Sequence, residues 1–125
     1  MAKENLINKE GTLIPDNLVA GHEFPLLIGG VTLKSGQGEL KRGTVIGLLT
    51  EDKKGVAVDK SKHDGSEIPY GILTDDVDAT EEVKATVYTT GLFNRNALLF
   101  GGEDNKVTDF EQQLRTLGIH LKHVI

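Results

Sequence analysis

The sequence contains no cysteine and no tryptophan, and aromatic residues account for only 5% of its 125 residues. Without cysteine, disulfide frameworks, thiolate-held zinc, iron–sulfur clusters and cysteine nucleophiles are all excluded. The scarcity of aromatic side chains also disfavours a sugar-binding pocket, because small-molecule sites depend heavily on aromatic lining. Stability must therefore come from packing or from association with other chains.

Long apolar runs are missing as well. The longest apolar stretch, residues 25–31, is far shorter than the roughly 20 residues that span a bilayer. Residues 1–10 lack the apolar core of about 7–15 residues that a secretory signal needs. The net charge is −5, with 14 basic residues scattered among 19 acidic ones, whereas nucleic-acid affinity depends on clustered Lys and Arg. We therefore expect a soluble protein, made without export through a cleaved signal, that binds neither nucleic acid nor a membrane.

Glycine, in contrast, is abundant: it makes up 15 of 125 residues, or 12%, against an average of about 7%. Glycine is costly inside helices and useful in turns that need a positive φ. From residue 24 onward, short β-branched or apolar segments alternate with polar, glycine-rich turns. The expected strands cover residues 24–28, 31–33, 44–50, 56–58, 68–74 and 83–90. The pattern predicts a single mainly β domain with minor α content (α+β) over residues 24–125.

Two segments that contain glycine carry more specific expectations. Gly47 lies inside an otherwise β-branched and apolar strand, which indicates a β-bulge or a close approach of another backbone. Residues 91–94 are expected to turn the chain after the strand 83–90. Asn94 is expected to cap a short helical turn that reaches residues 97–100.

Only one convincing helix is expected, and it begins at Thr108. Thr108 and Glu111 have the spacing of a capping box, and Gly118 supplies the C-terminal stop. An apolar stripe at i, i+4 and i+7 consists of Phe110, Leu114 and Leu117. A helix of about ten residues cannot form a core alone, so this stripe is expected to pack on the sheet.

Residues 1–23 show no sustained period of two or 3.6 residues, and we interpret them as an extended N-terminal arm. The apolar residues of the arm form two short groups, Leu6 with Ile7 and Leu13 with Ile14 and Pro15. The arm cannot bury these groups within itself, so it is either flexible, as many termini are, or lies on another chain. The residues alone leave both alternatives open.

The histidines are the first candidates for a metal or catalytic site, and the sequence has four: His22, His63, His120 and His123. His120 and His123 are three residues apart, but the helix has already ended at Gly118, and in a strand the two side chains would point to opposite faces. The HExxH motif is absent. We expect no metal site and no cofactor.

The acidic turn at residues 75–78 invites comparison with a calcium loop. A calcium loop of the EF-hand type that began at Asp76 would need Gly at its sixth position and Glu at its twelfth, yet these positions hold Glu81 and Val87. Residues 36–38, Gly-Gln-Gly, likewise lack the third glycine of a dinucleotide-binding loop, because that position holds Lys41. The sequence therefore favours solvated carboxylates and turn-forming glycines.

Nucleophilic catalysis finds no support in the sequence. The three serines, Ser35, Ser61 and Ser66, all fall in expected polar turns. His63 and Asp64 lie beside two of them, but adjacency in a loop is not the geometry of a catalytic triad. We expect no catalytic residue and no enzyme, although a pair of carboxylates brought together by the fold stays open as an alternative.

The order of several short motifs resembles a known family. The motifs are Leu-Lys-Arg-Gly-Thr-Val-Ile-Gly at 40–47, Asp-Gly at 64–65, Gly-Ile-Leu at 71–73 with Asp-Val-Asp at 76–78, Val-Tyr at 87–88, Gly-Leu-Phe-Asn at 91–94, Leu98, Arg-Thr at 115–116 and Gly-Ile at 118–119. Taken in this order, they resemble the head decoration proteins of tailed phages, whose prototype is decoration protein D of phage lambda. The resemblance covers roughly residues 24–125.

The resemblance implies a fold, a location and a set of partners. The fold would be a small β-barrel or tulip-like domain with one C-terminal helix and an extended N-terminal arm. The protein would be made in the host cytoplasm and would bind as a homotrimer to the outer surface of the expanded head, at three-fold sites of the major capsid protein. Its function would be to reinforce the head against the pressure of packaged DNA, without catalysis, cofactor or metal.

The same resemblance gives the arm a function, because arms of this family add an extended strand to a capsid loop. The residues that would bind the capsid are Leu6, Ile7, Leu13, Ile14 and Pro15. Strand addition uses main-chain hydrogen bonds for affinity and alternate side chains for specificity, which suits isolated apolar groups. The alternative function is a small β-barrel module that binds a ligand or carbohydrate within a larger assembly, and it would require a concave pocket lined by aromatic residues.

Overall fold

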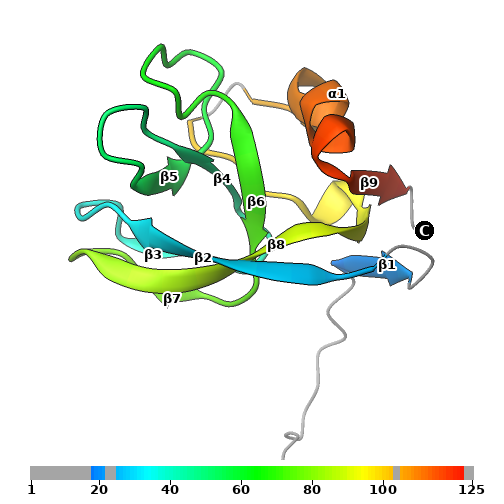
Figure 1. The fold of residues 1–125 in the computed structure, drawn as a ribbon, viewed down its shortest axis with the longest axis horizontal. Helices are drawn as coiled ribbons and strands as arrows, with labels where there is room; N and C mark the ends of the chain where they lie inside the picture. The colour runs from blue at the N-terminus through cyan, green and yellow to red at the C-terminus, as the bar shows by residue number, and fades with distance from the viewer. Residues whose placement is uncertain (1–17, 22–24, 103–104, 123–125) are drawn as a thin grey trace, which may run out of the picture.

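The computed structural model describes residues 18–21, 25–102 and 105–122. β-Strands are the commonest secondary structure, at 44% of the residues, together with one 3-10 helix (η1) and one α-helix near the C-terminal end (Figure 1). The strands are β1 (Val19–Gly21), β2 (Leu27–Leu33), β3 (Glu39–Leu40), β4 (Val45–Leu48), β5 (Gly55–Ala57), β6 (Pro69–Leu73), β7 (Val77–Asp78), β8 (Val83–Asn94) and β9 (Ile119–Lys122), and the helices are η1 (Arg95–Ala97) and α1 (Val107–Leu117). The expected mainly β fold with one C-terminal helix is confirmed.

Five of the strands close into a small barrel. The hydrogen-bonded order is β8, β2, β5, β4 and β6, and the ring closes because β6 also pairs with β8. The neighbours are antiparallel except β2 and β5, which are parallel and meet through the single residue pair Leu33 and Gly55. The joint between β2 and β5 is therefore much shorter than the joint between β2 and β8, which pair from Leu27 to Leu33.

Strand β8 is longer than expected, because residues 91–94 continue the strand and do not turn the chain. The first part of β8 belongs to the barrel, and the last part pairs with β1 on one side and β9 on the other. Gly91 permits the continuation: its φ is +149°, and a Cβ at this position would lie 2.6 Å from Leu26 Cδ2. Asn94 does cap a helical turn, since its side chain accepts a hydrogen bond from the N–H of Asn96. The turn is the 3-10 helix η1, which ends at Ala97 and is shorter than expected.

Strand β1 includes residues that we expected to belong to an extended arm. Val19 pairs with Phe93 and Gly21 with Leu92, and Leu18 is only 2% exposed. Residues 18–21 are therefore part of the folded domain. The rest of the expected arm, residues 1–17 and 22–23, lies outside the described residues.

The expected close approach at Gly47 is confirmed. A Cβ on Gly47 would lie 2.2 Å from the carbonyl oxygen of Ser66 and 2.8 Å from that of Ile68. The pairing of β4 with β6 also shifts register between Ile46 and Gly47. Only glycine lets the loop before β6 lie directly against β4.

Helix α1 ends at Gly118 as expected, with the glycine at φ +98°, but it begins earlier than expected. The residue before the first turn is Lys106, and its backbone N–H donates to the Asp109 carboxylate at 2.7 Å. The capping box predicted for Thr108 and Glu111 is thus wrong, because Asp109 provides the carboxylate and Glu111 instead pairs with Arg95. The predicted apolar stripe is shorter as well, since Phe110 and Leu114 are buried but Leu117 is 39% exposed.

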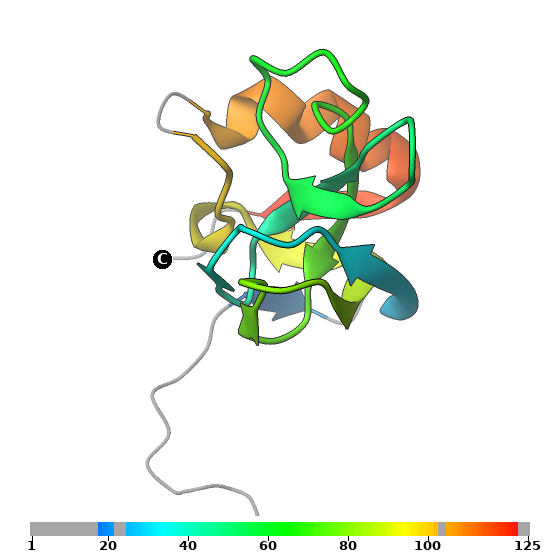
Figure 2. The same ribbon diagram turned by 90° about the vertical axis from the view of Figure 1, so that its left-hand side faces the viewer.

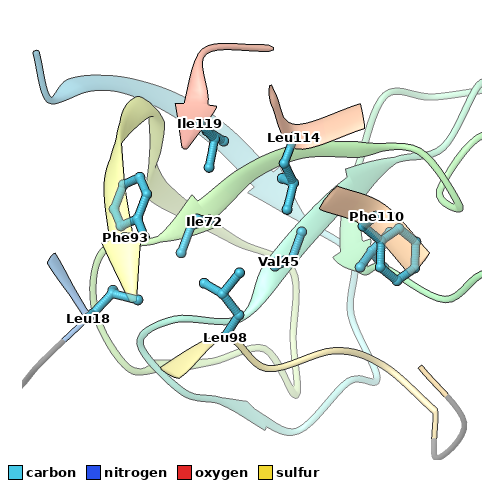
Figure 3. Close-up of a cluster of buried hydrophobic side chains, with 9 residues drawn as sticks. Leu18, Val45, Ile72, Phe93, Leu98, Phe110, Leu114 and Ile119 are labelled. Carbon is cyan, nitrogen blue, oxygen red and sulfur yellow. The ribbon is translucent and has the colours of Figure 1, made fainter. Parts of the chain in front are cut away.

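The buried side chains form two clusters. One cluster lies between the barrel, α1 and the strands β1 and β9, each of which pairs with β8 (Figure 3). It consists of Leu18, Val45, Val58, Ile72, Phe93, Leu98, Phe110, Leu114 and Ile119. The other lies within the barrel and consists of Val31, Leu33, Ile46, Leu73, Ala79 and Val87. Figures 1 and 2 show α1 and β1 on opposite sides of the molecule, so α1 covers one side of the first cluster and β1 covers the other.

Candidate functional site

The residues predicted to bind the capsid, Leu6, Ile7, Leu13, Ile14 and Pro15, lie outside the described residues, so the structure does not bring them together with anything. The point where the arm joins the domain is described. The carbonyl oxygen of Leu18 accepts a hydrogen bond from the N–H of Asn94 at 2.7 Å, and the Leu18 side chain is part of the core. Leu18, the residue from which the expected arm would leave the domain, is therefore held beside the end of β8.

Three aspartates, two in the loop between β5 and β6 and one at the end of β7, share one local structure that the sequence patterns above do not include. Each carboxylate accepts both the backbone N–H and the hydroxyl of the residue two positions later, which is the pattern of an Asx turn. The pairs are Asp59 with Ser61, Asp64 with Ser66 and Asp78 with Thr80, at distances between 2.5 and 3.1 Å. The recurring Asp-x-Ser or Asp-x-Thr spacing was the available sequence signal.

These hydrogen bonds decide the chemistry of the loop carboxylates. The backbone N–H and the hydroxyl of Ser61 lower the pKa of Asp59, and the hydroxyls and backbone N–H groups of Ser66 and Thr80 lower the pKa values of Asp64 and Asp78. A carboxylate that is held ionised is a poor general acid. The hydroxyls of Ser61 and Ser66 donate to aspartate, so neither is oriented by His63 as a nucleophile would be. The hydrogen bonds of these aspartates therefore stabilise the local backbone and do not form a catalytic site.

The two described histidines lie apart, with His63 exposed in a loop and His120 half-buried in β9. His22 and His123 lie outside the described residues. Across residues 18–21, 25–102 and 105–122, no three His, Cys, Asp or Glu side chains come together as metal ligands. In the acidic turn, Asp76 accepts a hydrogen bond from the backbone N–H of Arg42 at 2.7 Å. This carboxylate therefore holds the turn against the segment before β4.

Two hollows on the surface have the size of a ligand site but not the expected lining. One hollow, of about 410 Å³, lies between β2 and the loop after β4. The other, of about 320 Å³, lies beside β5 and includes the charged side chains of Lys34, Asp59, Lys62 and Asp64. Neither is lined by an aromatic side chain, so neither has the platform that the carbohydrate-binding alternative requires. None of the described helices has the length and hydrophobicity needed to cross a lipid bilayer.

The exposed apolar side chains are unevenly distributed. In the part of the chain that the structure describes, five large ones are more than a third exposed: Leu27, Ile28, Ile68, Leu99 and Leu117. Leu27 and Ile28 are the only two of these that are adjacent in the sequence, and at 55% and 63% exposure both project from the start of β2. Neighbouring residues of a strand point to opposite faces, so the start of β2 exposes apolar surface on both of its faces. This exposed apolar surface makes the start of β2 a candidate contact site.

The fold and these surface features define the class: a small, closed β-barrel whose candidate contact features, the start of an arm and an apolar strand, lie on its outside. The particular family follows from comparison with known proteins. The family model of bacteriophage lambda head decoration protein D matches residues 7–119. The chain therefore belongs to this family, and its role is decoration of the phage capsid in the virion. A comparison with curated proteins finds no match.

Proposed function

We propose that the protein binds as a homotrimer to the outer surface of the expanded phage head, at three-fold sites, and stabilises the head against the pressure of packaged DNA. Its partner there is the major capsid protein. The observation that carries the proposal is the family match, which extends over residues 7–119 and so includes both the barrel and most of the expected arm. As in the family at large, the function is structural and no reaction is catalysed.

The arm makes one contact with the capsid. Its candidate residues are Leu6, Ile7, Leu13, Ile14 and Pro15, which would add to a capsid loop as an extended strand. Ordering an arm on binding costs conformational entropy, so a single arm binds weakly. Three arms held by one trimer raise the effective concentration of the second and third arms. The buried anchor at Leu18 supports this arrangement, because it fixes where each arm leaves its barrel.

Composition supports the rest of the proposal. Three copies at −5 each carry a charge of −15, which disfavours direct binding to DNA. The absence of cysteine suits synthesis and assembly in the reducing host cytoplasm, where disulfides would not persist. Contacts with the shell and with sister subunits then supply stability that a disulfide would otherwise give.

The direct test is binding of the purified full-length protein to empty phage shells. We expect it to sediment with expanded shells and not with unexpanded ones, and to raise the temperature at which expanded shells disassemble. Failure to bind any expanded phage shell would overturn the proposal. Binding to both shell forms with equal affinity would contradict the proposed preference for the expanded lattice.

A further inference from the structure

Over residues 28–32, the edge of β2 that faces away from β8 has no partner strand among the described residues. The backbone N–H of Lys34 donates to the carbonyl oxygen of Gly55 at 3.0 Å, so it points away from β8. Successive residues of a strand aim their N–H groups at alternate edges, and the N–H groups of Thr32, Gly30 and Ile28 therefore point the same way. Strand β5 reaches only Leu33. We call the backbone of residues 28–32 on this side the β2 edge.

The space beside the β2 edge is open. The hollow of about 410 Å³ is lined by residues of β2 and β8 and by residues at and after the end of β4. They are Gly30, Val31, Thr32, Lys84, Ala85, Leu48 and Lys53. It lies where β2 diverges from the hairpin of β4 and β5, beyond their single residue pair. An added strand lies about 4.8 Å from its neighbour, and this hollow offers room for one.

The residues of the β2 edge also favour a close approach by another backbone. Gly30 is exposed, and a Cβ at this position would meet nothing within 4 Å. Leu27 and Ile28, just before it, offer exposed apolar surface on both faces of the strand. A long, apolar and unprotected strand edge is a site of aggregation unless something covers it. The β2 edge is thus suited to an occupant that extends the sheet.

Charge indicates what that occupant carries. Lys53 and Lys84 both line the hollow and are both exposed. Neither forms an ion pair with another described residue, although the protein as a whole is acidic. Two unpaired ammonium groups beside a strand edge favour an extended segment with carboxylate side chains.

We propose that the β2 edge binds an extended, acidic segment of the major capsid protein as an added strand. This inference rests on the proposed function and adds a second contact to it: the arm of the decoration protein adds to the capsid, and a capsid segment adds to the barrel. The partner supplies main-chain groups to Ile28, Gly30 and Thr32, apolar side chains over Leu27 and Ile28, and carboxylates to the two lysines.

The test compares Gly30→Pro with Gly30→Ala in the full-length protein. Proline removes the outward N–H but leaves the pairing of β2 with β8 intact, and proline is tolerated at strand edges where the N–H faces solvent. Alanine keeps the N–H and has room for its Cβ. We expect Gly30→Pro to weaken binding to expanded shells by about tenfold or more, and Gly30→Ala to change it by less than about twofold.

A second pair of variants keeps the test decisive if Gly30→Pro does not fold. The double variant Lys53→Glu and Lys84→Glu should weaken shell binding, whereas Lys62→Glu with Lys122→Glu, which changes the net charge equally at other exposed positions, should not. Equal effects of the two double variants would overturn the charge argument. Wild-type affinity in both Gly30→Pro and the first double variant would overturn the proposal.

Two further outcomes would assign the β2 edge to another occupant and overturn the proposal. One is a lower oligomeric state of Gly30→Pro in sedimentation velocity, which would make the edge an interface between copies of this chain. The other is that Gly30→Pro weakens binding only when residues 1–16 are present, which would make the occupant a sister arm. If the wild-type protein itself binds no expanded shell, the proposed function fails first, and the variants fail with it.

Discussion

At the scale of single residues, Gly47 shows how one missing side chain sets the packing of the barrel. The carbonyl oxygens of Ser66 and Ile68 occupy the space that a Cβ on Gly47 would need. Both oxygens belong to backbone, so neither can move without shifting the loop before β6. The sequence pattern indicated the close approach but not the partner, because the partner lies about 20 residues away along the chain.

We predict that Gly47→Ala lowers the free energy of unfolding by about 2–3 kcal/mol, because the barrel must open to accept the added methyl group. Urea unfolding followed by circular dichroism measures the change. Gly30→Ala is the matched control, since its Cβ meets nothing within 4 Å, and its stability should be unchanged or slightly raised. Equal destabilisation by both substitutions would contradict the packing argument.

Because of the aspartates in the Asx turns, we expect the free energy of unfolding to depend on pH in the acid range. The hydrogen bonds in the folded protein lower the pKa values of Asp59, Asp64 and Asp78. Their stabilisation is therefore present above the unfolded pKa of about 3.9 and is lost as the pH falls through the lower folded pKa values. We expect the free energy of unfolding to fall with decreasing pH below about pH 4.

The measurement is chemical unfolding of the wild type and of Asp64→Asn over this acid range. Asparagine can still accept from Ser66 but does not titrate, so the acid slope should be shallower in the variant. Asp59→Asn and Asp78→Asn should behave in the same way. Unchanged acid slopes in all three variants would show that these carboxylates do not couple to folding.

At the scale of elements, the sequence pattern predicted strands and the helix stop better than it predicted where strands continue. Alternation over residues 83–90 identified the barrel part of β8, and Gly118 ended α1 as expected. The continuation through residues 91–94 was missed because glycine is ambiguous: Gly91 lies inside a strand here, whereas glycine is also the commonest turn residue. Its pairing with β1 and β9 depends on chain segments far away in the sequence.

The helix start was missed for a related reason. Thr108 and Glu111 have the correct spacing, but the fold gives Glu111 to Arg95 and gives the cap to Asp109. Asp109 also contacts Lys60 from another loop at 3.2 Å. Tertiary partners therefore selected between two carboxylates that local spacing could not distinguish.

Strand β1 predicts a sharp limit for shortening the N-terminus. Deletion of residues 1–16 leaves Leu18 and β1 in place, so thermal unfolding should stay near that of the full chain. Deletion of residues 1–20 removes a leucine that is 2% exposed and should cost about 2–5 kcal/mol. Equal stability of the two truncated proteins would show that Leu18 does not anchor the arm. The shorter deletion should still weaken binding to expanded shells.

At the scale of the whole molecule, the candidate contact features lie on the outside of the barrel. They are the start of the expected arm at Leu18 and the exposed side chains of β2. Composition and the order of the motifs were sufficient to suggest the family, and the family match agrees. The β2 edge could not be predicted from sequence, because its freedom depends on β5 ending its pairing at Leu33. Local patterning describes a strand, whereas only the assembled sheet determines which of its edges lacks a partner.

The central claim is that this protein decorates the expanded head as a trimer at three-fold sites. Electron cryo-microscopy of expanded shells saturated with the full-length protein tests it most directly. We expect added density of three barrels around each three-fold and quasi-three-fold position, with none at the centres of the hexamers and pentamers. Density at those centres, or single barrels at isolated positions, would contradict it.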